Sequence, residues 1–167
     1  MRGKAHLFDR DRISTDEILP ARHQALADDA ELAKHAMAGI DPEFAQRSAR
    51  GDILLAGREF GFGTAREAAV RALAGARVAA VVARSFAPAF FRDALNNGFL
   101  AIECPAAVDG VRDGDLVEVD LKDGVVRNLI RGTAFGFVPF TPFALDILEA
   151  GGLLPYVLRQ TTGGSSA

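Results

Sequence analysis

The segment Gly61–Glu67 gathers two glycines, a hydroxyl and an arginine between an apolar run at 53–56 and an alanine-rich helical pattern at 68–76. We expect it to form a tight turn from a strand into a helix. Glycine lets a backbone approach a ligand closely, and the unpaired N–H groups at the start of a helix favour anions. Arg66 adds a planar guanidinium that suits a carboxylate or phosphate. The turn therefore predicts an anion pocket with the hydroxyl of Thr64 at its edge.

Two roles are open for each polar side chain of this turn. Arg66 either binds a carboxylate of a ligand or forms a salt bridge with a neighbouring acidic residue, and its place in a glycine-rich helix start favours the ligand. Thr64 either acts as a base or caps the helix, and one hydroxyl could do both.

The length and composition indicate one globular domain. The chain has 167 residues, of which 49% are apolar and 25% charged, and this is enough for a single domain with a core. We place the domain at residues 1–160 and expect the small, polar residues 161–167 to form a disordered tail. The net charge of −3 and the lack of a basic cluster argue against nucleic acid as a partner.

Targeting signals and cysteine content indicate the cellular compartment of the protein. No apolar run approaches the roughly 20 residues that cross a bilayer, and residues 1–6 lack the apolar stretch of a secretory signal. We therefore expect no membrane partner. The single cysteine, Cys104, excludes an internal disulfide and an all-cysteine metal site within this chain. Together these features predict a cytoplasmic protein.

The centre of the chain alternates strands with helices. Apolar runs predict strands at 51–57, 78–83 and 99–104. Helical patterns lie between them, one from the glycine-rich turn to about Ala74 and one at 87–95. Continuous apolar runs are typical of strands buried on both faces of a sheet. This order predicts a parallel α/β unit with right-handed crossovers.

The N-terminal part contains shorter elements. Leu7–Phe8 could open a strand, and Ser14–Glu17 offers several capping side chains for a following helical segment. We expect a helix at 28–37 with Gly39 as its stop, because acidic residues come early in it and basic ones late. A second short helix is expected from Asp41, with a proline in its first turn.

The C-terminal part begins with a strand and ends with a helix. Residues 116–121 alternate apolar and polar side chains, as in a half-exposed strand. Lys122–Gly124 is a hairpin turn signal, and the return strand begins at Val125. A last helix is expected at 142–150, where Gly151 would end it.

Several segments together resemble one protein family. They are Ser14–Arg22, Asp41–Phe44, Gly51–Ile53, Gly57–Glu67, Ala83–Ala87 and Phe91–Gly98. Their order and spacing across about residues 3–155 resemble the small subunits of 3-isopropylmalate dehydratase, which form the swivelling domain of the aconitase superfamily.

The resemblance implies a fold and an activity. The fold is a three-layer β/β/α swivelling domain of the α/β class. The activity is that of a hydro-lyase in leucine biosynthesis, in which this chain is active only with an aconitase-type large subunit. That partner carries the [4Fe–4S] cluster, while this chain binds no cofactor. The substrate is a small 2-hydroxy di- or tricarboxylic acid, with 3-isopropylmalate the first choice.

Two alternatives remain beside this reading. The chain could be the small subunit of a homoaconitase or of a dimethylmalate- or methylcitrate-type dehydratase. It could also be a diverged, non-catalytic swivelling domain that binds a carboxylate or a partner protein.

The glycine-rich turn matches the family motif with substitutions. The usual motif resembles Gly-x-Gly-Ser-Ser-Arg-Glu-His. Thr64 replaces the first serine, Ala65 the second and Ala68 the histidine, whereas Arg66 and Glu67 are retained. The resemblance implies that Thr64 is the catalytic base and that Arg66 holds a substrate carboxylate.

The resemblance also nominates other site residues. Substrate contacts are expected from Gly63, Ala65, Arg22 and His23, and orienting or structural roles from Asp16, Glu67 and Ser85.

Ordinary roles stay open for some of these residues. Arg22 could be a surface arginine. His23, in the family's substrate-sorting segment, could be a solvated histidine. Asp16 could cap residues 17–19, and Ser85 could fix the end of a strand.

The remaining chemically notable residues have structural explanations. Phe86, Phe90 and Phe91 follow helical spacing and should be core. Cys104 should be a small buried apolar residue. The histidines lack nearby cysteines or carboxylates at ligand spacing, so we assign no metal site to this chain.

Overall fold

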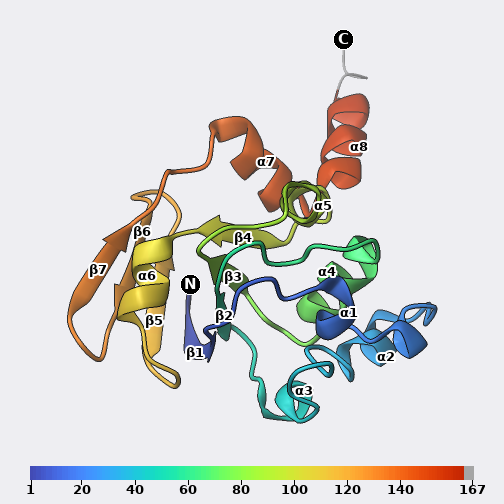
Figure 1. Ribbon diagram of the computed structural model, residues 1–167. Coiled ribbons are helices and arrows are strands. Elements are labelled where there is room, and N and C mark those ends of the chain that lie inside the picture. The colour runs from blue at the N-terminus through green and yellow to red at the C-terminus, as the bar shows by residue number, and fades with distance from the viewer. Residues whose placement is uncertain (164–167) are drawn as a thin grey trace.

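The computed structural model describes residues 1–163 and contains one mixed β-sheet (Figure 1). Its order is β4-β3-β2-β1-β5-β6-β7. Strands β1 to β4 are parallel, and β5 to β7 are antiparallel to their neighbours. The strands are β1 (Arg2–Phe8), β2 (Ile53–Ala56), β3 (Ala80–Ala83), β4 (Leu100–Glu103), β5 (Leu116–Asp120), β6 (Val125–Asn128) and β7 (Thr133–Gly136).

Helices cover the parallel half of the sheet and extend beyond it (Figure 1). They are α1 (Thr15–Ile18), the 3-10 helix η1 (Ala21–His23), α2 (Asp29–Ala33), α3 (Phe44–Arg47), α4 (Arg66–Gly75), α5 (Pro88–Asn96), α6 (Pro105–Gly110), α7 (Pro142–Ala150) and α8 (Leu153–Gly163). No helix within residues 1–163 has both the length and the apolar character to cross a membrane.

The parallel strands are buried on both faces, which explains their continuous apolar sequences. On β2, Leu54 and Ala56 pack into a cluster with the helices, whereas Ile53 and Leu55 pack with the side chains of β5 and β6. The helices, the parallel strands and the antiparallel strands thus form successive layers. The predicted layered α/β fold is confirmed.

Most expected elements are present within a few residues of their predicted bounds. The three central strands, both central helices, the β5–β6 hairpin and α7 all appear. Phe90 is completely buried, Phe86 nearly so, and Phe91 packs against the same cluster. Cys104 is buried as well. These predictions were correct because each relied on a strong local apolar pattern.

The helix expected at 28–37 is much shorter. It ends at Ala33, and the following backbone pairs with α1 instead of continuing the helix. Met37 N donates to Ile18 O at 2.6 Å, and Gly39 N donates to Glu17 O at 3.0 Å. The expected short helix from Asp41 begins later, at Phe44. Long-range backbone hydrogen bonds therefore override the local helical pattern.

The C-terminal boundary also differs from the expectation. Helix α8 continues past residue 160 to Gly163, and the hydroxyls of Thr161 and Thr162 both donate to Leu158 O. These side chains satisfy the helix's own carbonyl groups, so small polar residues did not prevent helix formation. Residues 164–167 of the expected tail lie outside the described part of the chain.

Strand β1 is longer than expected and lies in the middle of the sheet. Its sequence contains Lys4 and His6, which break the apolar pattern. His6 is nevertheless buried, because its Nε2 lies 2.6 Å from Asp52 Oδ2. Burial acts to raise the pKa of Asp52, but the Ala49 N–H and the His6 imidazole outweigh it and lower that pKa below 3.8.

The glycine-rich loop between β2 and α4 is tied to the segment that precedes α1. Gly61 N donates to Ile13 O, and Thr15 N donates to Phe62 O, both at 2.8 Å. Gly63 has a φ of +123°, and a Cβ atom there would overlap the Thr15 hydroxyl. Only glycine combines this backbone conformation with this close approach.

We expect Gly63→Ala to lower the free energy of unfolding by about 2–4 kcal/mol, because it adds steric overlap to backbone strain. The matched control is Gly132→Ala, since Gly132 also has a positive φ, +70°, but has no atom within 4 Å of its added Cβ. The control substitution should lower the free energy of unfolding by about 1 kcal/mol. Urea unfolding of both variants measures the difference, and equal losses would show that the contact with Thr15 is unimportant.

Candidate functional site

The candidate site lies at the carboxyl edge of the parallel strands. Phe8, Ala56, Ala83 and Glu103 are neighbours in register, so the loops that follow β1, β2 and β3 leave the sheet side by side. In open α/β sheets this edge is where ligands usually bind. The glycine-rich turn is part of the loop after β2.

Thr64 has an exposed hydroxyl at the start of α4. The N-cap of this helix is Ala65, and no side chain caps it. Within residues 1–163 the Thr64 hydroxyl has no hydrogen-bond partner. The capping role considered for Thr64 is therefore wrong. The first N–H groups of a ten-residue helix thus lack a side-chain acceptor, and a free hydroxyl lies beside them.

Arg66 is held by two contacts. Its Nε donates to Asp93 Oδ2 on α5 at 2.9 Å, and its Nη1 donates to Gly63 O at 3.2 Å. The salt bridge considered for Arg66 is therefore present. A guanidinium has five N–H donors, so three of them have no partner within residues 1–163. The remaining donors allow Arg66 to bind an anion while it stays paired with Asp93.

Asp16 lies in the first turn of α1 and does not cap it. The cap is Ser14, which forms a capping box with Glu17. Burial acts to raise the pKa of Glu17, but the Ser14 N–H and the Arg10 guanidinium lower it below 4.5. Asp16 instead accepts a hydrogen bond from Gln24 Nε2 at 2.7 Å, and the same amide donates to Leu19 O. Asp16 therefore fixes the turn that carries Arg22 and His23.

His23 is half-buried and stacks on His35. The ring centroids are 3.4 Å apart and the planes differ by 2°. Burial, the facing His35 and the nearby Arg22 lower the pKa of His23 below 6.5. Arg22 itself is exposed. No hydrogen bond or ion pair within the described residues connects Arg22 or His23 to the glycine-rich turn.

Ser85 supports the loop after β2. Its Oγ accepts from Glu59 N at 2.8 Å, and its carbonyl accepts from Phe60 N at 3.1 Å. This arrangement matches the structural role considered for Ser85. Glu67 is exposed in the first turn of α4, where a negative charge is favoured by the helix dipole.

Ion pairs join the loops around this edge. Arg84 is the best connected, since it bonds Asp9 after β1 and Asp109 on α6. The bonds to Asp9 and Asp109 raise the pKa of Arg84 above its ordinary value. Arg12 pairs with Glu59 at 3.5 Å and stacks over the Phe62 ring. The edge therefore has several cations that already have acidic partners.

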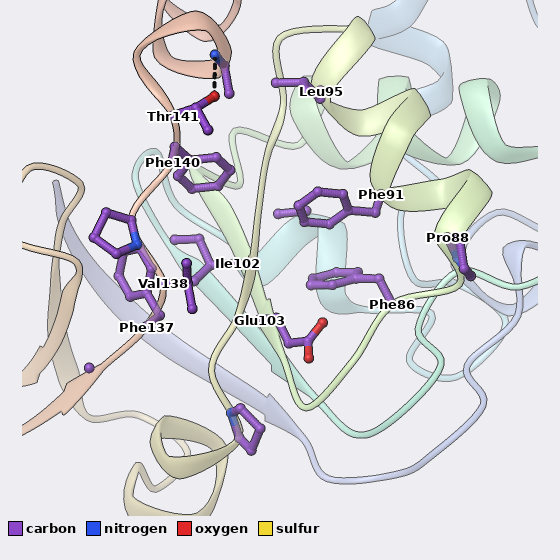
Figure 2. A pocket seen from close by; sticks show the side chains of 15 residues that line it. Phe86, Pro88, Phe91, Leu95, Ile102, Glu103, Phe137, Val138, Phe140 and Thr141 are labelled. Atoms are coloured by element: carbon purple, nitrogen blue, oxygen red, sulfur yellow. Dashed lines mark hydrogen bonds between the residues drawn. The ribbon is translucent and has the colours of Figure 1, made fainter.

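A separate apolar groove of about 1150 Å³ lies between α5, β4 and the β7–α7 connection. Figure 2 shows Phe86 and Phe91 on one side, facing Val138 and Phe140 on the other. No residue of the predicted site lines this groove. The hydroxyl that lines it, on Thr141, caps α7, and no arginine lines it, so the groove does not replace the glycine-rich turn as the candidate site.

The described residues do not fit an iron–sulfur cluster. Within residues 1–163, no group of three or more His, Cys, Asp or Glu side chains is placed to hold a metal ion. The one cysteine is buried, and burial raises the pKa of the Cys104 thiol, which disfavours the thiolate that cluster ligation needs.

Two residues of this site escaped the sequence analysis. Asp93 pairs with Arg66, and Thr15 packs against Gly63. Both lie in segments that carry the family resemblance, but neither has a local pattern that marks it. Their contacts join positions far apart in the chain, so one sequence gives no signal for them.

Comparisons with known proteins identify the family of this chain. Residues 6–107 match the family model described as the aconitase C-terminal domain. The 3-isopropylmalate dehydratase small subunit of Deinococcus deserti is 50% identical over 94% of this chain and 87% of its own length. The small subunit of Pyrobaculum calidifontis is 50% identical over 96% of this chain and 98% of its own.

A solved structure shows the same fold. The crystal structure of a 3-isopropylmalate dehydratase from Methanocaldococcus jannaschii has a TM-score of 0.92 and 36% identity. It covers 98% of this chain and 96% of its own. The chain therefore belongs to the family of 3-isopropylmalate dehydratase small subunits, within the aconitase C-terminal domain family.

Proposed function

We propose that this chain is the small subunit of a heteromeric hydro-lyase that dehydrates and rehydrates isopropylmalate in leucine biosynthesis. The observation that carries the proposal is the uncapped start of α4, where the free Thr64 hydroxyl lies beside Arg66. The small subunits of Deinococcus deserti and Pyrobaculum calidifontis, which align over most of their length, are named for 3-isopropylmalate dehydratase.

In this proposal the chain supplies the base and a carboxylate clamp. The free donors of Arg66 bind one substrate carboxylate, which fixes the substrate over the turn. Thr64 Oγ1 then takes the proton from the carbon next to the one that carries the hydroxyl. The electron pair of the broken C–H bond forms the C=C bond, and the C–O bond breaks to release hydroxide, for which the partner's cluster would supply the Lewis acid. Rehydration returns the proton from the same oxygen.

A hydroxyl is a weak base, so its surroundings must stabilise the alkoxide. The N-terminal N–H groups of α4 and the Arg66 guanidinium supply positive potential beside Thr64. Asp93 offsets part of the arginine charge, which leaves the helix start as the important second source. Ala65 offers no hydroxyl, so Thr64 acts without the second side chain of the usual motif.

The partner in this proposal is an aconitase-type large subunit. It supplies the [4Fe–4S] cluster, because the described residues of this chain do not fit one. The substrate is a small 2-hydroxy dicarboxylic acid that binds between the two subunits. The unpaired thiol of Cys104 is consistent with a reducing compartment, and we place the complex in the cytoplasm.

Reconstitution with the large subunit tests the proposal directly. We expect the mixture of the two chains to convert isopropylmalate and neither chain to do so alone. The absorbance of the unsaturated acid measures the conversion. Homocitrate, citrate and methylmalate-type acids serve as the comparison substrates. Preference for one of these would assign the chain to a related dehydratase. Absence of turnover on every acid, with a large subunit whose cluster is verified spectroscopically, would contradict the hydro-lyase proposal.

The role of Thr64 is tested by two matched substitutions in the reconstituted complex. Thr64→Val keeps the shape but removes the hydroxyl, and we expect kcat to fall about 10²–10⁴-fold. Thr64→Ser keeps the hydroxyl and should retain activity close to wild type. Undiminished turnover by Thr64→Val would remove Thr64 as the base, whatever the overall activity of the complex.

A further inference from the structure

Helix α5 supports the glycine-rich turn at two points. Gly61 lies so close to Phe90 that a Cβ atom at position 61 would overlap the ring. Asp93 lies three residues further along the helix and bonds Arg66 Nε at 2.9 Å. Residues at this spacing share one face of a helix. The same face of α5 therefore supports the start of the turn and holds the arginine near its end.

The contact with Asp93 is suited to directing the guanidinium. Both side chains are partly buried, with 34% of Arg66 and 27% of Asp93 exposed, so the pair is shielded more than most ion pairs of this chain. Asp93 occupies Nε, and Gly63 O occupies one hydrogen of Nη1. These two contacts fix the plane and direction of the guanidinium and leave its outer donors available.

We propose that Asp93 is a positioning residue that aims Arg66 at the substrate carboxylate. The inference rests on the proposed role of Arg66 in substrate binding. Asp93 does not itself face the substrate in this account. Its carboxylate keeps the guanidinium from turning toward other acids or toward solvent, so that the outer donors are ordered before the substrate arrives.

A positioning role predicts a specific kinetic change. In Asp93→Asn the amide retains the shape but loses the charge that holds Nε, so Arg66 becomes free to reorient. We expect KM for the dicarboxylate to rise about tenfold and kcat to change less than KM, because loss of the Asp93 charge and displacement of Arg66 have opposite effects on the positive potential beside Thr64. Asp93→Glu restores the charge and should return KM part of the way toward wild type.

The experiment is a double-mutant cycle in the complex reconstituted with its large subunit. It compares wild type, Asp93→Asn, Arg66→Lys and the double variant, with thermal unfolding to establish that each chain folds. Asp146→Asn, an exposed acid on α7, controls for the loss of one negative charge. If Asp93 acts through Arg66, its substitution should raise KM in the wild-type background and add little in the Arg66→Lys background.

Two results would overturn the inference and are distinguishable from failure of the proposed function. An unchanged KM in Asp93→Asn, with a raised KM in Arg66→Lys, would keep Arg66 as the clamp and remove Asp93. Fully additive effects would show that Asp93 acts independently of Arg66. An unchanged KM in Arg66→Lys would instead remove the clamp itself, and with it the role of Asp93. If Asp93→Asn does not fold, Asp93→Ser, which also removes the carboxylate, provides the same comparison.

Discussion

The close pairing of two loops is the constraint on which the rest of the site depends. The loop after β2 and the segment before α1 are joined by backbone hydrogen bonds that Gly61 and Thr15 donate. Gly63 lies directly against the Thr15 hydroxyl. The missing Cβ atom of Gly63 allows this approach. Because the loop is held from the α1 side, α4 begins at a fixed point above the carboxyl edge of the sheet. Without these contacts, the loop after β2 could move so that the Thr64 hydroxyl bonded the first N–H groups of α4.

That constraint explains why reactive groups remain unsatisfied in an otherwise well-bonded chain. No buried side-chain nitrogen or oxygen within residues 1–163 lacks a hydrogen bond. At the turn, the exposed hydroxyl of Thr64 is unbonded and Arg66 keeps free donors. Helix α5 supports the opposite side of the turn through Phe90 and Asp93. The turn is therefore fixed by both neighbours but open toward a ligand, as preorganised binding requires.

The sequence predicts the parts of this arrangement that depend on local patterns. The buried strands, the turn into α4 and the family resemblance all follow from short runs of residues. Strand β1 was predicted too short, because its sequence includes His6, which can be buried in the sheet only when Asp52 pairs with it. The stacking of His23 on His35, the early end of α2 and the Arg66–Asp93 pair likewise depend on contacts between distant positions. No local propensity encodes those contacts.

In the proposed complex, Thr64 and Arg66 of this chain form one half of an active site that the large subunit completes. A structure of the complex with bound substrate tests it most directly. We expect the Thr64 hydroxyl oxygen to lie within about 3.5 Å of the carbon that loses its proton, with Arg66 bonded both to a substrate carboxylate and to Asp93. Substrate carboxylates bound away from residues 61–67, or a Thr64 hydroxyl turned onto the α4 backbone, would contradict it.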